Sequence, residues 1–527
     1  MELFQIKRSG PLKGSQPLYV RVEDGHFDPL TGAMEMGTVL SLDTYFNSFS
    51  CSQYLYWTRA EAATAELVCD GSFRAELWAC RDGKDELLNH IEGRNQVKIP
   101  FDFSKEGKNC RYWIRLTAKE TCRFQGGRYW TTAEPQRIHI ALIVCTYRRE
   151  AYLLRNLDIL IRNFSTHIGP QADFEIFVVD NGNTLFDRFP CREGFWLFPN
   201  KNLGGSGGFT RGLMEVLRRR NEFTHVLLMD DDVVLESNAL WKTVQFLKIL
   251  RPQYQELQLA GGMLDLDSPL VQYEATARWE KGRIHSLKQG LSFDDRQALI
   301  QNEKKEHATY GAWWYLCMPL SQISRDNLPF PFFIKCDDVE YGLRNMSFIT
   351  TLNGIGVWHQ GFASKYAPWI DYYMARNSMI LSALYPQNGN GVVTFLWKRS
   401  LSNLAMDIPQ AQIFLKRAVE DFKKGPEFFL QTDMEEIHRE LSGILPGQIC
   451  ALSKRRRILH LFSKVFTVMF WRGLIQTAFL TVEYCKIRSA LEKEYCSHWK
   501  ALITWRQWEQ RLNLSSKPND KDVEEIK

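Results

Sequence analysis

The first of three hydrophobic patterns along the chain covers residues 1–134, where short stretches alternate apolar and polar residues between turn signals. In the stretch RYWIRLTA, alternation places Tyr112 and Ile114 on one face and Trp113 on the other. Two Asp-Gly pairs, one of them at Asp70, mark turns. The pattern predicts a β-sandwich of about seven or eight strands. Its aromatic residues fit a packed core better than a carbohydrate-binding surface, although both interpretations stay open.

The second pattern, over residues 135–385, consists of near-continuous apolar runs separated by amphipathic stretches. RIHIALIVCTY and FEIFVVDNG flank the helix candidate REAYLLRNLDILIRNF, which predicts a parallel sheet covered on both faces. A glycine-rich loop, NLGGSGGF, then leads into a helix. The next strand, THVLLM, ends in Asp230, Asp231 and Asp232. Open α/β sheets bind their ligands at the carboxyl ends of such strands, so we expect the site there.

The third pattern is helical and covers residues 386–515, followed by a tail, 516–527, that we expect to be disordered. The most apolar stretch, 465–485, carries Arg472 and Glu483 where a spanning helix would face lipid. The sequence therefore predicts a buried or interfacial helix here and not a transmembrane one.

Composition narrows the classes of partner and the compartment. The 66 basic and 61 acidic residues leave a net charge of only +5, which predicts no nucleic-acid partner. Twelve cysteines occur singly, without C-x-x-C spacing, and the first residues lack the apolar core of a secretory signal. We therefore expect a cytoplasmic protein. The basic run at 453–460 and the tryptophan-rich stretch after it fit either a peripheral contact of 453–512 with the cytoplasmic face of the inner membrane, or packing on the catalytic domain or in a homo-oligomer.

The acidic triplet suggests a metal site. Adjacent carboxylates are costly to pack unless a cation neutralises them, and a hard divalent metal does so through oxygen ligands. By itself a DDD triplet is a weak signal, because acidic loops are common. It gains weight from the preceding glycine-rich loop and helix N-terminus, which can approach a phosphate closely. The loop lacks the G-K-[ST] ending of a P-loop.

Three later segments join the triplet. GAWWY places Trp313 and Trp314 side by side after a glycine. FFIKCDDVEYGLR predicts a strand that ends in acids, with Asp337 and Asp338 opening a helix whose positive end suits carboxylates. GIGVWH ends another apolar strand in His359, whose imidazole could complete a metal shell.

The motifs and their order along the chain resemble those of the family 2 glycosyltransferases of the GT-A fold. They are IVCTYRR, VVDNG, NLGGSGGFTRG, LLMDDDV, GAWWY, FIKCDDVEYGLR and VWH. The resemblance is closest to the bacterial galactofuranosyltransferases and covers about residues 137 to 380. It implies an α/β, Rossmann-like GT-A catalytic domain with an N-terminal β-sandwich domain and a C-terminal, mostly α-helical region.

The resemblance also implies roles for individual residues. Asp230, Asp232 and His359 would hold Mn²⁺ or Mg²⁺ on the diphosphate of a UDP-sugar. Asp338 would be the general base, and its neighbour Asp337 would position the acceptor or the donor. The remaining positions would line the donor pocket at Thr146, Arg148 and Asp180 (uridine), Asn202, Gly204 and Gly205 (donor pocket wall) and Asp231 (sugar or ribose), and the acceptor site at Trp313 and Trp314.

The implied chemistry is a single displacement with inversion at the anomeric carbon. A carboxylate takes the proton of the acceptor hydroxyl, and a metal offsets charge on the departing diphosphate. We expect galactofuranose transfer from UDP-galactofuranose to a lipid-linked or cell-surface polysaccharide acceptor, as in bacterial envelope biosynthesis. Two alternatives stay open: the same chemistry with another nucleotide sugar, as in a rhamnosyltransferase, or a catalytically inactive carbohydrate-binding protein. A nucleotidyltransferase is disfavoured, because no second triphosphate cradle follows.

Overall fold

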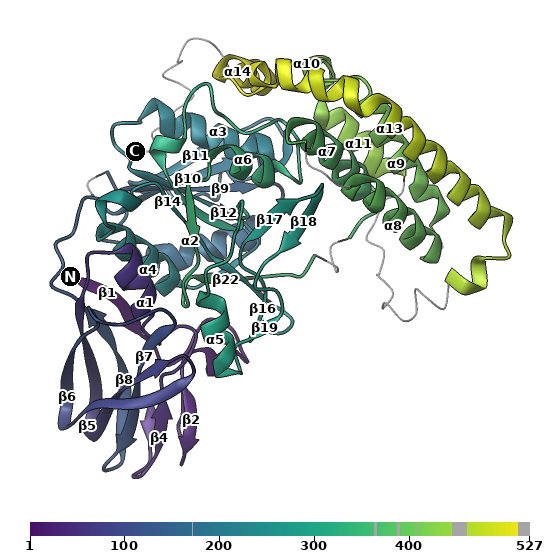
Figure 1. The fold of residues 1–527 in the computed structure, drawn as a ribbon. Coiled ribbons are helices and arrows are strands. Elements are labelled where there is room, and N and C mark those ends of the chain that lie inside the picture. Colours follow the sequence, from purple (N-terminus) through teal and green to yellow (C-terminus); the bar gives the residue numbers. More distant parts are fainter. Residues whose placement is uncertain (171, 363–365, 387–389, 407, 445–460, 515–527) are drawn as a thin grey trace.

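Three regions lie next to one another in the computed structural model of the protein: a β-sheet at the N-terminus, a central α/β layer and an arm of helices (Figure 1). The expected disordered tail, 516–527, and the whole basic run, 453–460, lie outside the described residues. The structure describes residues 1–170, 172–362, 366–386, 390–406, 408–444 and 461–514.

Eight strands at the N-terminus belong to one hydrogen-bonded sheet, in the order β1-β8-β5-β7-β4-β2, with β3 on β8 and β6 on β5. The long β5 joins its two halves, because one edge pairs with β6 and the other edge pairs first with β8 and then with β7. The turn expected at Asp70 is a bend within β5, where Gly71 has φ +138°. The strands are β1 Glu2–Ile6, β2 Arg21–Asp24, β3 Ala33–Met34, β4 Val39–Ser41, β5 Ala62–Arg81, β6 Lys84–Asp102, β7 Cys110–Ala118 and β8 Cys122–Trp130.

The N-terminal sheet packs directly on the central layer through one continuous hydrophobic core. Strand β1 lies along helix α4 (Ser237–Lys248) of that layer. The Asn238 amide of α4 bonds the Gln5 backbone twice, accepting from its N–H at 3.0 Å and donating to its carbonyl at 2.7 Å. Lys7 forms an ion pair of 2.6 Å with Glu236. A side chain of the central layer therefore provides hydrogen-bond partners for backbone groups at the edge of β1.

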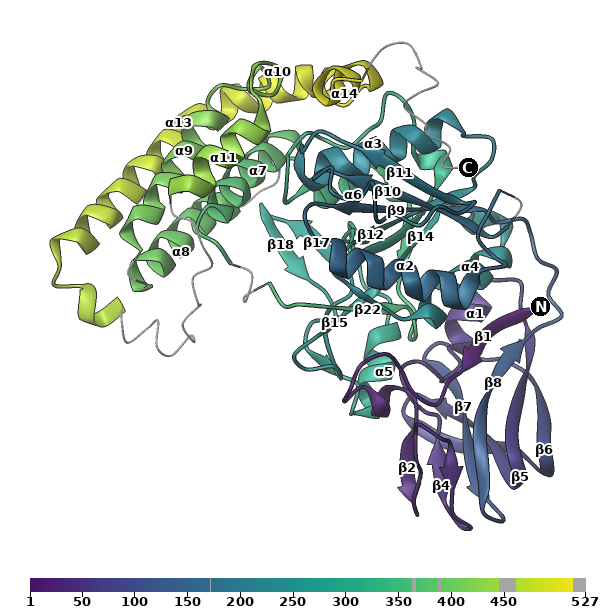
Figure 2. The ribbon, with the colours of Figure 1, turned by 180° about the vertical axis from the view of Figure 1, so that it is seen from behind.

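The central sheet has seven strands in the order β11-β10-β9-β12-β20-β14-β21, and β9 to β12 run parallel. Alternation along β9 sends Leu142 to the face covered by α2 and α4, and Ile143 to the face covered by α3 (Figure 2). The predicted parallel arrangement with two covered faces is found for β9 to β12, whereas β20 pairs antiparallel with β12 and β14, so the whole sheet is mixed. Its elements are β9 Ile140–Thr146, α2 Glu150–Phe164, β10 Phe174–Asp180, β11 Phe195–Pro199, α3 Gly204–Arg218, β12 His225–Asp230, β14 Leu257–Ala260, β20 Tyr315–Pro319 and β21 Phe348–Thr350.

A smaller sheet, in the order β13-β22-β15-β16-β19, lies at the carboxyl end of β12. Its strand β13 begins two residues after Asp232, the last residue of the acidic triplet. β13 pairs with β22, which brings Val234 opposite Trp358. This pairing places His359, the last residue of β22, beside the triplet. The remaining elements are β13 Val234–Leu235, β15 Gly262–Asp265, β16 Val271–Glu274, β17 Ala277–Glu280, β18 Arg283–Ser286, β19 Leu291–Ser292, α5 Arg296–Glu303, α6 Asp337–Asn345 and β22 Gly356–His359, with the short helices α1 Cys51–Trp57, η1 Gln16–Leu18, η2 Pro252–Tyr254 and η3 Leu320–Gln322.

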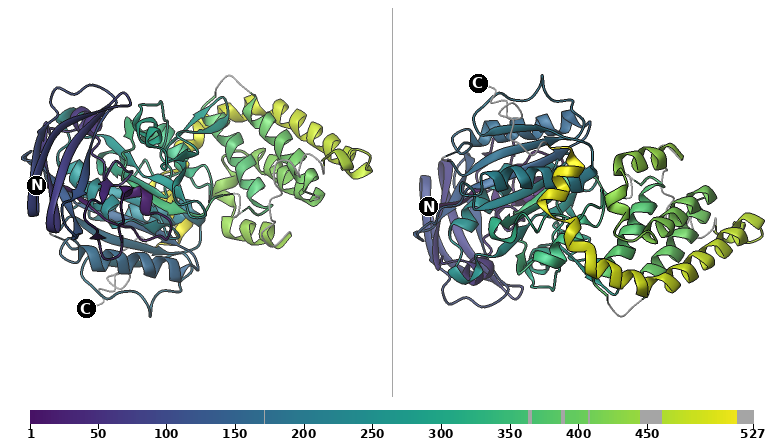
Figure 3. Two further views of the ribbon diagram at one scale, coloured as in Figure 1. Left: turned by 90° about the horizontal axis from the view of Figure 1, so that it is seen from below. Right: turned by 90° about the horizontal axis from the view of Figure 1, so that it is seen from above.

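The C-terminal helices form an arm that extends away from the two sheets (Figure 3). The last helix, α14, returns to the central layer, where Trp508 is buried and its Nε1 donates to the Pro329 carbonyl at 3.0 Å. In the part of the chain that the structure describes, no helix has both the length and the apolar character that crossing a bilayer requires. The arm contains α7 Ile370–Leu384, α8 Gly391–Ala405, η4 Pro409–Ala411, α9 Gln412–Phe422, α10 Phe428–Gln431, α11 Met434–Ile444, α13 Val468–Leu502 and α14 Trp505–Leu512.

Candidate functional site

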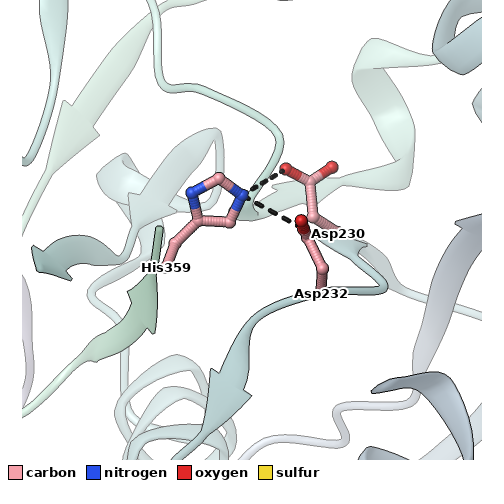
Figure 4. Close-up of side chains that lie close together, drawn as sticks. All are labelled: Asp230, Asp232 and His359. Carbon is pink, nitrogen blue, oxygen red and sulfur yellow. Dashed lines mark hydrogen bonds and ion pairs between the residues drawn. The ribbon is translucent and has the colours of Figure 1, made fainter. Parts of the chain in front are cut away.

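The end of β12 and the end of β22 bring three metal-ligand side chains together. His359 Nε2 lies 3.1 Å from an Asp232 carboxylate oxygen and 3.9 Å from an Asp230 oxygen (Figure 4). One ligand atom from each of the three residues lies within 4.8 Å of the other two. The sequence predicted these three residues as a set, and the structure places them as a cluster.

The donor set of this cluster fits a divalent cation. Two carboxylates and an imidazole offer the oxygen and nitrogen ligands that Mn²⁺ and Mg²⁺ accept. Asp232 and His359 are buried, whereas the Asp230 side chain is partly exposed, so a diphosphate could approach from that side. The Arg149 guanidinium forms an ion pair with Asp232 and lies 3.6 Å from Asp231, which offsets part of the carboxylate repulsion. Sequence reasoning did not single out Arg149.

Asp231 is not part of the cluster of metal-ligand side chains and contacts the end of β9. Its carboxylate accepts a hydrogen bond of 2.6 Å from the Thr146 hydroxyl at the end of that strand. Burial raises the pKa of Asp231 to about 7, and the charge of Asp232 adds to the shift. Arg148 follows with an exposed side chain and φ +55°, and its guanidinium lies 5.2 Å from the Tyr147 ring centre. Thr146 is therefore hydrogen-bonded to Asp231, whereas Arg148 lies at the protein surface beside the carboxyl end of β9.

Asp180 organises the loop that follows β10. One carboxylate oxygen accepts the Gly182 N–H at 2.9 Å, and the other accepts the N–H groups of Thr184 at 2.6 Å and Leu185 at 2.9 Å. β10 and β9 pair so that Asp180 lies opposite Thr146. Asp180 thus holds a loop beside Thr146 in one conformation, and its expected contact with uridine stays a prediction.

The glycines that were expected to form a loop lie in the first turns of α3, because this helix begins at Gly204, and this end of α3 docks onto the segment that precedes α6. Asn202 accepts the Gly204 N–H at 3.1 Å, and Gly204 has φ +67°. A Cβ at Gly204 would lie 2.2 Å from the Phe333 carbonyl oxygen, so only glycine fits there. The Ser206 N–H donates to the same Phe333 carbonyl at 3.1 Å, and the Ser206 hydroxyl donates to the Asp337 carboxylate at 2.8 Å. Ser206 is a second contact that the sequence did not reveal.

The segment before α6 corrects one sequence expectation. The sequence predicted a strand that ends in Asp337 and Asp338, whereas the structure has an irregular segment in which Phe333, Lys335 and Cys336 adopt φ +77°, +65° and +69°. Left-handed conformations of non-glycine residues are costly and persist where surrounding contacts impose them, and here the first turn of α3 docks against this segment. The expected helix does begin at Asp337.

Asp338 lies in the first turn of α6 in surroundings that disfavour its charge. Desolvation by the surrounding protein and the neighbouring Asp337 raise its pKa to about 8, while the Lys335 ammonium opposes the shift. Its carboxylate accepts the Val339 N–H at 2.8 Å. Buried Glu274, which sequence reasoning missed, adds a further negative charge and also has a raised pKa. The pair Asp337 and Asp338 is therefore a carboxylate pair that holds protons more tightly than ordinary aspartates.

Trp313 and Trp314 precede β20, and both are 5% exposed. Trp314 donates from Nε1 to the Gly261 carbonyl at 2.9 Å. Trp313 packs edge-on against Phe209 of α3 and Tyr341 of α6. Among the described residues, its buried Nε1 has no hydrogen-bond partner. An indole N–H in this state is costly unless another group accepts it.

The comparisons with known proteins agree with the motifs. The family described as glycosyltransferase like family 2 matches residues 135–296. Galactofuranosyltransferase GlfT2 of Mycolicibacterium smegmatis is 24% identical over 466 residues, covering 80% of this chain and 71% of that protein. The corresponding GlfT2 of Mycobacterium tuberculosis is 23% identical over 458 residues, covering 78% and 70%. A solved structure of the mannosyltransferase PcManGT from Pyrobaculum calidifontis, in complex with GDP-Man and Mn²⁺, has a TM-score of 0.32, 11% identity, and coverage of 68% of this chain and 89% of that one.

Proposed function

We propose that the chain transfers galactofuranose from UDP-galactofuranose with inversion. The premise is that it is a family 2 glycosyltransferase related to the galactofuranosyltransferases. The observation that carries this proposal is the cluster of Asp230, Asp232 and His359 at the carboxyl end of β12. The acceptor that we propose is a lipid-linked or cell-surface polysaccharide.

In this proposal, Asp230, Asp232 and His359 hold Mn²⁺ or Mg²⁺. When bound, the ion supplies positive charge that offsets the charge of the departing diphosphate. The chain's own residues hold the donor: Asn202 shapes the turn at Gly204, where the backbone can approach the donor closely. The proposed donor pocket comprises Thr146, Arg148, Asp180, Asn202, Gly204, Gly205 and Asp231.

On the acceptor side, we assign the proton transfer to Asp338. A base works best when its pKa lies near the working pH, and the raised pKa of Asp338, about 8, meets that condition. Ser206 fixes the orientation of the neighbouring Asp337, which would position the acceptor. Trp313 and Trp314 would shape the acceptor site.

The test of this function is an assay of the purified protein with Mn²⁺ and a panel of UDP- and dTDP-sugars, following release of the nucleoside diphosphate. Selective turnover of UDP-galactofuranose is the expected result. Turnover of dTDP-rhamnose instead would keep the reaction class and reassign the donor. Absence of turnover with every donor, in the presence of oligosaccharide acceptors, would favour a carbohydrate-binding protein.

We also propose that the N-terminal half of α13 lies on the cytoplasmic membrane surface. The tryptophans of α14 pack on the central layer, so they are not the contact. The side chains before and within the first turns of α13 are different: large apolar groups face solvent there, beside Lys464 and Arg472. The exposed apolar residues are Phe462, Phe466, Val468, Met469, Trp471, Ile475, Phe479 and Val482. Basic and aromatic residues together suit an anionic lipid interface.

Replacing two of these residues tests the membrane contact. We expect Phe466→Ser/Phe479→Ser to lower the fraction that floats with phosphatidylglycerol vesicles more than tenfold, because burying each Phe contributes about 1.5–3 kcal/mol. Ile413→Ser/Leu430→Ser, at exposed apolar positions elsewhere on the arm, is the matched control. Equal flotation of both double variants would contradict the contact, and a changed oligomeric state of the first would assign the surface to self-association.

A further inference from the structure

Apart from the site described above, a cavity of about 520 Å³ opens between the N-terminal sheet and the central layer. It lies between α1, η2, β21 and the end of α5. The described residues that line it include none of the proposed donor, metal or acceptor residues. Ligand pockets commonly have this size and occur where domains meet.

One wall of the cavity is aromatic. Tyr56 and Trp57 come from α1, and Tyr254 comes from η2. The rings of Tyr56 and Tyr254 stack with centres 5.4 Å apart, and Trp57 meets Tyr254 edge-on at 4.8 Å. Tyr56 is 45% exposed, so the stack remains accessible to a ligand. Such a wall offers a rigid apolar face with phenol groups at its edge.

The floor and rim of the cavity carry groups of both charges. Half-buried Lys288 donates to the Thr351 hydroxyl at 2.8 Å, and half-buried Glu303 accepts from the Ser50 hydroxyl. Further charged residues of both signs line the cavity, with basic residues in excess: Lys108, Arg111, Arg251, Lys304 and Lys305 with Glu106 and Glu306. Because basic residues outnumber acidic ones, an anion is the competing ligand, and the accessible stack of Tyr56 and Tyr254 is the feature that favours a neutral glycan. A neutral ligand with many hydroxyls can donate to the acids and accept from the lysines.

We propose that this cavity binds a neutral oligosaccharide, as a second site for the glycan acceptor. The assignment of the ligand as the acceptor rests on the proposed transferase function. The geometry also links the two sites: Ala308 lines the cavity, and Tyr310, two residues later, lies directly against Gly342 of α6, the helix that carries Asp338. A short segment therefore separates the cavity from the proposed base.

A second site beside the first has a specific kinetic consequence. An acceptor long enough to occupy both sites gains affinity from the second contact, whereas a short acceptor cannot. The cavity would therefore lower KM for long acceptors and leave KM for short acceptors unchanged. It would hold the growing chain near Asp338 without touching the reacting atoms.

Tyr56→Ala tests the site, because it removes an exposed ring without opening the core. Calorimetry on the full chain measures the affinity for three neutral hexasaccharides, of galactofuranose, rhamnose and glucose, and for inorganic phosphate. We expect at least one hexasaccharide to bind wild type and to lose about tenfold in affinity in Tyr56→Ala, the order expected for one aromatic contact. Tyr152→Ala, at a similarly exposed tyrosine on α2, should bind like wild type.

Kinetics with the active donor complete the test. Tyr56→Ala should raise KM for the hexasaccharide acceptor about tenfold and leave KM for the disaccharide unchanged. Equal affinities of Tyr56→Ala and Tyr152→Ala, binding of phosphate alone, or no hexasaccharide binding at millimolar concentration would each overturn the site. The calorimetry needs no turnover, so a failure of the transferase proposal leaves this result readable on its own.

Discussion

Asp338→Asn lowers the rate of sugar transfer by about a hundredfold to ten thousandfold while UDP affinity stays close to that of wild type. The reason is that a general base acts only as the acceptor hydroxyl attacks, and a positioned base contributes a factor of this size. Asparagine has nearly the same shape but cannot take the proton. The measurements are kcat with the donor found active and UDP binding by calorimetry with Mn²⁺.

Asp267→Asn, at an exposed aspartate of the same catalytic region, is the matched control and should keep wild-type turnover. The pH profile gives a second readout. Because Asp338 must be deprotonated to act and its pKa is raised to about 8, kcat/KM should rise with pH and level off above that value. Near-normal turnover of Asp338→Asn, or a residual activity with the same pH dependence as wild type, would remove Asp338 from the role.

Asp232→Ala, the second large effect, should weaken Mn²⁺-dependent UDP binding by at least tenfold. It removes the carboxylate nearest to His359 and the ion-pair partner of Arg149 together. His359→Ala should act in the same direction, because it removes the one nitrogen ligand of the set. Loss of coordinating or supporting groups around a metal commonly costs 10- to 100-fold in affinity.

Calorimetry with UDP, in Mn²⁺ and then in EDTA, measures the metal-dependent part of the affinity. The controls are Asp326→Ala and His285→Ala, at exposed positions outside the cluster. If Asp232→Ala and His359→Ala bind UDP in Mn²⁺ as tightly as the controls do, these residues do not form the metal site. A melting temperature for each variant separates lost binding from lost folding.

The sequence predicted the parts of the site that lie at strand ends. Asp230 and Asp232 follow the apolar run of β12, and open α/β sheets bind ligands at such carboxyl ends, so their position could be expected without coordinates. His359 ends a strand of a different sheet and reaches them because β22 pairs with β13. The helix that begins at Asp337 was also predictable, because acidic residues favour a helix N-terminus.

Contacts between segments distant in the chain were not predictable in this way. The left-handed conformation of Phe333 occurs where its carbonyl accepts from the first turn of α3, a contact that local propensities do not encode. The ion pair of Arg149 and the hydrogen bond of Ser206 depend on side-chain distances across the fold. The cavity beside Tyr56 combines segments from both sheets, so no single stretch of sequence indicates it.

The hydrogen bonds between Asn238 and the Gln5 backbone have a consequence for how such a protein could evolve. A domain that is gained or exchanged by recombination needs a boundary that few contacts cross. Here the first strand depends on an amide from α4, and one hydrophobic core continues across the boundary. An ancestor that exchanged the N-terminal region would have exposed apolar side chains and left the edge of β1 without partners, so the two regions are constrained to change together.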